Sequence, residues 1–203
     1  NGNPLAVRDF ILSMYQKGTL KFNRQHREWE WDLASINNEP PTENVSVTLA
    51  NRIRHLEPVT SNLLQIASCI DSEFDIETLQ SIARLPLTIV SQKLSSSVKE
   101  GYLLSAPVQP GIQNKKVNYL FAHERVQQAA YSLLTTSRRK QIHTEIGQVF
   151  LESDRSLSNI FEVVNQLNNS FESPDIVGFN RNELAELNVT AGRRAKKSAA
   201  FQA

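Results

Sequence analysis

The sequence predicts a mainly α fold that contains a small β-hairpin, a winged-helix domain and, after it, a helical, repeat-like region. Apolar residues recur at helical spacing along most of the 203 residues. The period changes to the alternation typical of strands at two places, residues 20–33 and 102–121. Between residues 58 and 121 the elements follow the order helix, short helix, helix and β-hairpin, which is the winged-helix pattern.

The composition is that of a soluble globular protein with one large or two small domains, since 40 % of the residues are apolar and 21 % charged. With 22 basic and 21 acidic residues the net charge is +1, which gives no reason to expect nucleic acid or an anionic membrane as partner. No apolar run approaches the roughly 20 residues of a membrane helix. Cys69 lies among apolar residues, as a core cysteine does, and is compatible with the reducing cytoplasm.

Residues 1–42 are predicted to form a helix and a hairpin. Pro4 suits the first position of a helix, and Gly18 suits its end. The apolar stripe of this helix consists of Val7, Phe10, Ile11 and Met14. Two alternating runs then predict a hairpin with Phe22, Trp29 and Trp31 on one face. We expect this face to cover a neighbouring domain, although an aromatic pair could also stack a ligand.

A break of turn residues at 37–42 predicts a domain boundary, and residues 43–135 then contain four helical patterns before a hairpin and a fifth helix. Pro58 and Pro86 lie near the starts of the second and fourth helices, and Asp75 is the predicted N-cap of the third. The predicted inward positions are Leu49, Ile53 and Leu56; Leu63, Ile66, Ala67 and Ile70; Ile76, Leu79 and Ile82; and Ile89 or Val90, Leu94 and Val98.

His123 lies at the junction between the second hairpin strand and the following helix. The strand pattern places Tyr119 and Phe121 on one face, and the helix is marked by Val126, Ala129, Ala130, Leu133 and Leu134. Donors and partial positive charge collect at a helix N-terminus, so this position suits an anion such as a phosphate. The alternative is a histidine that caps the turn or completes the core.

Residues 136–203 are predicted to be entirely helical. Ser137 is the predicted cap of the first helix. The three apolar stripes are Ile142, Ile146, Val149 and Phe150; Ile160, Val163, Val164 and Leu167; and Leu184, Leu187, Ala191 and Ala195. Small residues at the later contacts of the last stripe are typical of stacked helical repeats.

The sequence contains no recognisable catalytic centre. It has no phosphate loop, no dinucleotide-binding glycine motif and no histidine or cysteine cluster with metal-ligand spacing. His26, His55 and His143 have polar or charged neighbours and are predicted to be solvated surface residues.

A winged helix also raises the alternative of DNA binding, with residues 88–99 in the major groove. Lys93 and Lys99 on this helix and Lys115 and Lys116 on the wing would contact DNA. DNA affinity needs several contacts to phosphates, and guanine is usually read by arginine. Four lysines without an arginine provide few such contacts, so nucleic acid is not the expected partner.

Several motifs resemble a known family. Gly2-Asn3-Pro4-Leu5 resembles the G-x-P motif of STAND-class signalling ATPases, relatives of the AAA+ and NB-ARC proteins. Phe121-Ala122-His123-Glu124 is similar to the M-H-D motif of their winged-helix domain, with glutamate in place of aspartate. Residues 121–131, 29–32 and 184–199 resemble the predicted-ATPase module of large bacterial kinases that also carry Ser/Thr-kinase-like, GAF and histidine-kinase domains.

The resemblance implies a nucleotide-dependent switch. It implies that Pro4, in the motif that Gly2 begins, packs on the adenine of bound ADP or ATP, and that His123 contacts the β-phosphate of ADP in the inactive state. The phosphate loop would belong to an upstream nucleotide-binding domain, because the chain starts without an initiator methionine and is expected to be an internal piece of a longer protein.

The sequence therefore predicts three parts: residues 1–42 as a helix and hairpin of an ATPase lid region, 43–135 as the winged-helix domain and 136–203 as a helical region leading into TPR-like repeats. Together they are expected to sense the nucleotide state and relay it within a cytoplasmic signalling kinase. The expected partners are the upstream nucleotide-binding domain, downstream helical repeats and other proteins, with no membrane. The remaining alternatives are a DNA-binding winged helix and a structural interaction scaffold.

Overall fold

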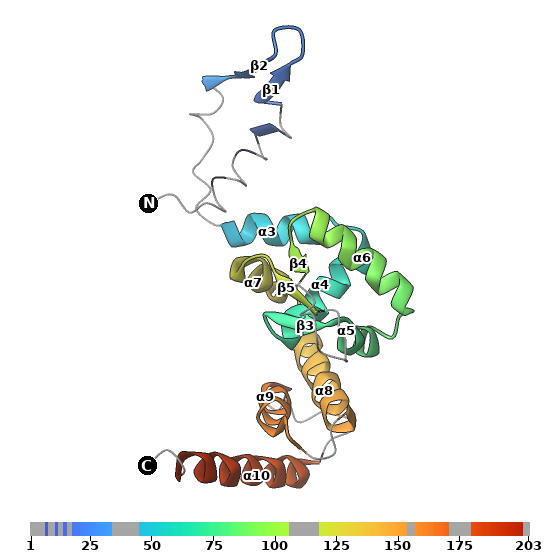
Figure 1. The fold of residues 1–203 in the computed structure, drawn as a ribbon, viewed down its shortest axis with the longest axis vertical. Coiled ribbons are helices and arrows are strands. Elements are labelled where there is room, and N and C mark those ends of the chain that lie inside the picture. The colour runs from blue at the N-terminus through green and yellow to red at the C-terminus, as the bar shows by residue number, and fades with distance from the viewer. Residues whose placement is uncertain are drawn as a thin grey trace, which may run out of the picture.

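The computed structural model describes residues 7, 11, 14, 15, 18–33, 45–105, 118–153, 157–170 and 180–200. These residues are mainly helical and include two small antiparallel sheets, so the predicted mainly α class is confirmed. Figure 1 shows the hairpin, the central helices with the second sheet, and the C-terminal helices following one another along the long axis.

The predicted N-terminal hairpin consists of β1 (Leu20–Asn23) and β2 (Glu28–Trp31). Phe22 pairs with Trp29, and Leu20 with Trp31, so the aromatic side chains share one face as predicted. Both tryptophans are half exposed or more. Gly18 precedes the hairpin with φ of +74°, a conformation that favours glycine. Of the predicted first helix, Gly2, Pro4 and Phe10 lie outside the described residues.

The central part consists of helices and three short strands. Its elements are α3 (Val45–Arg54), α4 (Pro58–Ile70), β3 (Glu73–Asp75), α5 (Ile76–Ala83), α6 (Leu87–Lys99), β4 (Leu103–Ser105), β5 (Asn118–Phe121) and α7 (Glu124–Ser132). The predicted order of helix, short helix, helix and hairpin is present, and β3 is an addition that the sequence did not predict. The antiparallel sheet has the order β3-β5-β4, so β5 pairs with both other strands.

Local sequence signals explain the helix starts in this part. Asp75 caps α5 as predicted, because its carboxylate accepts hydrogen bonds from the backbone N–H of Thr78 at 2.8 Å and from its hydroxyl. Pro58 opens α4, where its missing N–H costs nothing. In α6 the inward residue is Val90, which is fully buried, whereas Ile89 is exposed.

One apolar core unites the central part with the start of the C-terminal helices. It includes Leu64, Leu79, Leu94, Tyr119 and Phe121 from the central elements, and α7 packs on α3 and α4. Ile142 and Ile146 of the next helix belong to the same core and are fully buried. The first C-terminal helix therefore docks on the central part through apolar contacts.

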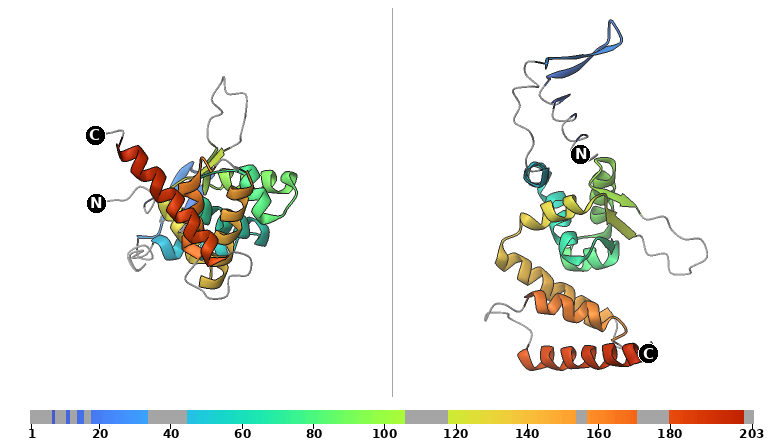
Figure 2. Two further views of the ribbon diagram at one scale, coloured as in Figure 1. Left: turned by 90° about the horizontal axis from the view of Figure 1, so that it is seen from below. Right: turned by 90° about the vertical axis from the view of Figure 1, so that its left-hand side faces the viewer.

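The C-terminal helices are α8 (Thr136–Ser153), α9 (Ile160–Ser170) and α10 (Arg181–Ala200). They stack in this order, with α9 between α8 and α10 (Figure 2). Two predictions were wrong. The hydroxyl of Thr135, not Ser137, accepts a hydrogen bond from a first-turn N–H of α8, because that helix begins one residue before Ser137. Ala195 is exposed, whereas Leu184 and Ala191 are buried as predicted.

Two helical glycines provide a matched test of the α8–α9 contact. A Cβ added to Gly147 of α8 would lie 2.5 Å from Cδ2 of the buried Leu167, whereas a Cβ on Gly192 of α10 meets nothing within 4 Å. Alanine at Gly192 should stabilise the protein by about 0.5–1 kcal/mol through helix propensity. Alanine at Gly147 has the same propensity gain but overpacks the contact, so we expect it to be less stable than Gly192→Ala by roughly 1–3 kcal/mol in urea denaturation. Equal stabilities would contradict this close approach of α8 and α9.

Candidate functional site

His123 is the N-cap residue of α7. Its backbone is extended, with φ of −159° and ψ of 146°, and its Nδ1 accepts a hydrogen bond from the N–H of Arg125 at 3.1 Å. The structure thus shows the capping role that the sequence left open as an alternative. Because Nδ1 accepts, the neutral ring carries its proton on Nε2. The side chain is exposed, and this Nε2–H can donate to a ligand without loss of the cap.

Glu124 does not orient His123. Its carboxylate accepts a hydrogen bond from Nε2 of Gln128 at 2.7 Å, one helical turn further along α7. The other two predicted nucleotide-contacting residues, Gly2 and Pro4, lie outside the described residues. Of the predicted site, only His123 is therefore placed.

His143 was predicted to be a solvated surface residue, and this prediction is wrong, because the side chain is buried. Only 4 % of it is exposed. Its Nδ1 lies 2.6 Å from Oε1 of Gln166 on α9, and its Nε2 lies 3.2 Å from the hydroxyl of Tyr131 on α7. Both ring nitrogens thus have a polar partner from another helix, as buried polar groups require.

Gln166 joins this pair to the C-terminal end of α4. Its Nε2 donates to the carbonyl oxygens of Cys69 and Ile70, each at 3.0 Å. These two bonds fix the orientation of the amide, so that its Oε1 must accept from His143. The neutral imidazole therefore carries its proton on Nδ1, and its Nε2 accepts from the hydroxyl of Tyr131. All the polar atoms of this network are satisfied in that state.

The surroundings of the network favour neutral groups. Burial lowers the pKa of His143, and the nearby guanidinium of Arg139 lowers it further, while the hydrogen bond with Gln166 acts in the opposite direction. Arg139 lies 4.3 Å from the centre of the Tyr131 ring, and its Nε donates to the Tyr131 carbonyl oxygen. Burial also raises the pKa of the Cys69 thiol to about 12, so this cysteine is an inert core residue at neutral pH.

The network connects α4, α7, α8 and α9 through side chains, and we refer to His143, Gln166 and Tyr131 with the two α4 carbonyls as the junction network. Hydrogen bonds between buried partners are directional, so the network specifies how the C-terminal helices sit on the central part. One sequence signal pointed to it. Gln166 lies inside the apolar stripe of α9, and a polar residue there needs a buried partner.

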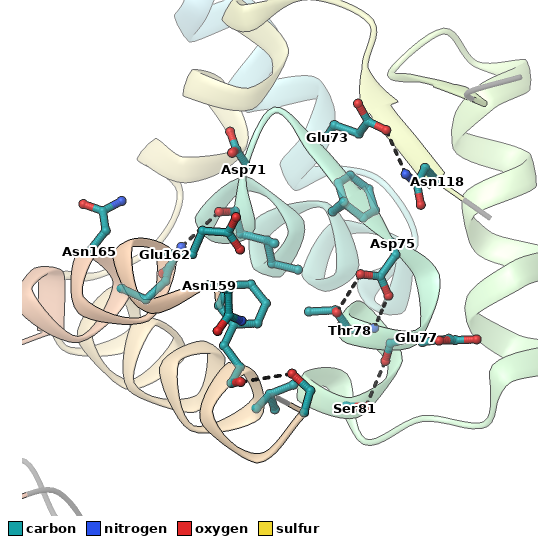
Figure 3. A pocket seen from close by; sticks show the side chains of 16 residues that line it. Asp71, Glu73, Asp75, Glu77, Thr78, Ser81, Asn118, Asn159, Glu162 and Asn165 are labelled. Atoms are coloured by element: carbon teal, nitrogen blue, oxygen red, sulfur yellow. Dashed lines mark hydrogen bonds between the residues drawn. The ribbon is translucent and has the colours of Figure 1, made fainter. Parts of the chain in front are cut away.

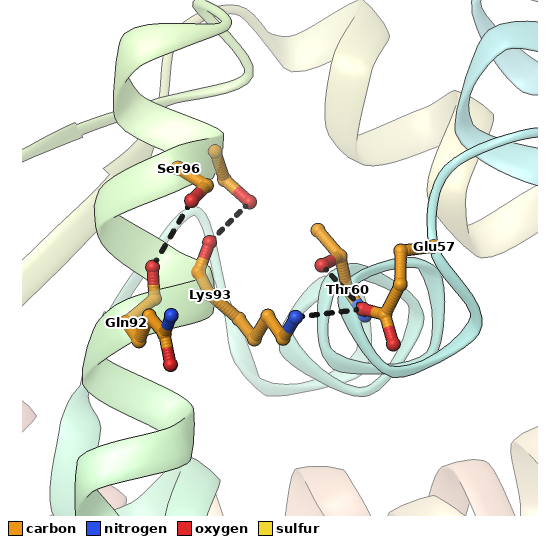
Figure 4. A network of polar contacts seen from close by, with 6 residues as sticks. Glu57, Thr60, Gln92, Lys93 and Ser96 are labelled. Atoms are coloured by element: carbon orange, nitrogen blue, oxygen red, sulfur yellow. Dashed lines mark hydrogen bonds and ion pairs between the residues drawn. The ribbon is translucent and has the colours of Figure 1, made fainter.

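The helix that would read DNA in the alternative interpretation is α6. Figure 4 shows that the ammonium group of Lys93 lies beside Glu57 at the start of α4, at an N–O distance of 3.2 Å. The same carboxylate caps α4 through Thr60. Lys99 is exposed, whereas Lys115 and Lys116 lie outside the described residues. One of the two lysines on α6 is therefore already engaged with an acidic group.

Two further classes of site are absent from the part of the chain that the structure describes. There, no group of three or more histidine, cysteine, aspartate or glutamate side chains is arranged to hold a metal ion. In the same part, none of the helices has the length and apolar character that crossing a membrane requires.

Comparison with known proteins places the chain beside histidine kinases. It is 25 % identical to hybrid signal transduction histidine kinase G of Dictyostelium discoideum, over 99 % of this chain and 7 % of that protein. It is 22 % identical to the peroxide stress-activated histidine kinase mak3 of Schizosaccharomyces pombe, over 84 % of this chain and 7 % of that protein. The chain thus spans about 7 % of the length of these curated relatives. No family model and no solved structure matches it.

These similarities indicate the context of a signalling kinase. Both relatives are eukaryotic proteins, whereas the motifs resemble a module of bacterial kinases. The name of neither relative refers to an ATPase.

Proposed function

We propose that this segment senses the nucleotide state of a STAND-type ATPase and relays it within a large cytoplasmic signalling kinase. The similarity to two histidine kinases supports the signalling context. The observation that carries the relay is the position of α7, which begins at the cap His123 and ends beside the junction network through Tyr131. A nine-residue helix thus joins an exposed donor to the contacts that hold α8 and α9.

In this proposal His123 donates from Nε2 to the β-phosphate of ADP, which an upstream nucleotide-binding domain supplies. Pro4, within the motif that begins at Gly2, packs on the adenine. A hydrogen bond to a charged phosphate is stronger than one between neutral groups, so ADP would hold α7 and the segments attached to it in the inactive arrangement. Exchange of ADP for ATP would release this contact and shift the helical regions.

The test is the ADP affinity of the parent protein, with its proposed phosphate-loop domain, before and after His123→Ala. Loss of one charge-assisted hydrogen bond should weaken ADP by about 1.5–3 kcal/mol, or roughly 10-fold to 150-fold, and ATP less. His123→Asn is the companion variant, because asparagine is also a good N-cap and removes the ring donor without removing the cap. His26→Ala, which alters an exposed histidine in the hairpin, should leave ADP affinity unchanged.

Unchanged ADP affinity in both folded His123 variants would contradict nucleotide sensing and would favour the structural scaffold. DNA binding has less support, since Lys93 of α6 is engaged with Glu57. A gel shift by the 203-residue chain that weakens steeply with salt would favour DNA binding instead.

A further inference from the structure

A cleft of about 610 Å³ opens between the β3–α5 segment and the helices α8 and α9 (Figure 3). Its volume is within the range of about 300–1,000 Å³ that is typical of ligand sites. The apolar part of its lining consists of Ile70, Phe74, Val149 and Phe150. The cleft is therefore large enough for the side chains of a bound segment.

The polar lining is acidic on both sides. Asp71, Glu73, Asp75 and Glu77 come from the β3–α5 side, and Glu162 comes from α9. Among the described residues that line the cleft, none is a lysine, arginine or histidine. The whole chain has a net charge of +1, so five carboxyl groups in a lining whose described residues include no basic side chain are a local excess of negative charge.

Most of these carboxylates have no positive partner among the described residues. Asp75 is occupied as the cap of α5, and Glu73 accepts one hydrogen bond from Nδ2 of Asn118 at 2.9 Å. Asp71 accepts from the N–H of the residue that follows it. The side chains of Glu77 and Glu162 are exposed, and no ion pair to a described residue is formed by either. The charges of Glu77 and Glu162 are thus not neutralised by any described residue.

Two buried oxygen atoms of the cleft also need donors. Oδ1 of Asn118 and Oδ1 of Asn159 are inaccessible to solvent and accept no hydrogen bond from the described residues. The bond from Asn118 to Glu73 fixes the amide of Asn118, so its oxygen cannot be exchanged for the nitrogen by a flip. A buried acceptor without a donor costs about 1–3 kcal/mol. Because both oxygens are closed to solvent, a ligand in the cleft reaches them only if the side chains of Asn118 and Asn159 rotate toward it.

We propose that this cleft binds an arginine-containing basic peptide segment. The guanidinium group has five N–H donors in a planar fork, so one side chain can bond both oxygens of a carboxylate together. Its methylene groups would pack on Phe74 and Phe150, as long basic side chains do on apolar surfaces. This partner goes beyond nucleotide sensing, and it would act beside the junction network, because Gln166 and Ile70 also line the cleft.

The experiment measures binding of a fluorescent peptide of alternating arginine and alanine to the 203-residue chain by anisotropy. Its reference is a peptide of the same length with citrulline, which keeps the shape and removes the charge. The test variant is Glu73→Gln with Glu162→Gln, which removes one carboxylate from each side of the cleft. The matched control is Glu28→Gln with Glu186→Gln, which removes the same charge from exposed positions on the hairpin and on α10.

We expect the arginine peptide to bind the wild-type chain at least tenfold more tightly than the citrulline peptide does. The cleft variant should lose at least tenfold in affinity, and the control variant less than twofold. Equal losses in the two variants would show that the binding is nonspecific attraction and would overturn the proposal. No preference of the wild-type chain for arginine over citrulline would overturn it as well. All four substituted side chains are exposed, so both variants should fold, and thermal unfolding is the measurement that checks this.

Discussion

Replacing Gln166 by alanine is expected to lower the free energy of unfolding by about 3–5 kcal/mol. The substitution removes three buried hydrogen bonds at once, one with His143 and two with the end of α4. Each abandoned donor or acceptor that stays buried costs about 1–3 kcal/mol, and the truncated side chain leaves a cavity that adds to this loss. Urea denaturation followed by circular dichroism measures the effect.

Asn169→Ala provides the control for this prediction. Asn169 lies on the same helix, α9, and is exposed. We expect its substitution to change stability by no more than about 0.5 kcal/mol, as is usual for surface positions. If Gln166→Ala were as mild as Asn169→Ala, the contact between α9 and the end of α4 would be peripheral, and the proposed relay would lose its mechanical basis.

Replacing His143 by alanine is expected to lower the free energy of unfolding by about 2–4 kcal/mol at pH 7.5. The change removes a buried ring, and this ring is the hydrogen-bond partner of both Gln166 and Tyr131. This loss should depend on pH. The pKa of His143 is lowered in the folded state, so the unfolded chain binds the proton more readily. Its contribution to stability is complete above the unfolded pKa, near 6.5, and is lost as the pH falls toward the lower folded value.

Denaturation at several pH values tests this prediction. The contribution of His143 should fall by up to about 1.4 kcal/mol per pH unit in that window, so wild type and His143→Ala converge on acidification. Replacing His26, which is exposed in the hairpin turn, should leave the wild-type pH dependence in place. A stability gap that stays constant between pH 7.5 and 5 would show that His143 contributes through packing alone.

Local patterns were sufficient to predict the helices from α3 to α10 and both hairpins. In α9, Ile160, Val163 and Leu167 have helical spacing and are all fully buried or nearly so. Asp75 was recognisable as a cap because capping needs only a short polar side chain and a nearby N–H. Such features depend on residues within a few positions of one another, which is why the sequence shows them.

Features that depend on distant partners were missed. His143 has Lys140 and Glu145 as near neighbours in sequence, which is typical of a surface position, but its partner Gln166 lies 23 positions away. Strand β3 is only three residues long and becomes a strand by pairing with β5. The predicted nucleotide site is tested only in part. His123 caps α7, which is one of the two roles that the sequence allowed, whereas its contact with ADP stays a prediction.

The central position of β5 has a consequence for the order of folding. Among the described residues, β3 and β4 pair with β5 alone, and Asn118 lies 45 positions beyond its hydrogen-bond partner Glu73. During synthesis α4, α5 and α6 can form as soon as they emerge, but neither earlier strand has a neighbour until residues 118–121 have left the ribosome. The three-stranded sheet therefore cannot form before β5 is available, and a chain that stops before residue 118 leaves β3 and β4 without this partner and prone to aggregation.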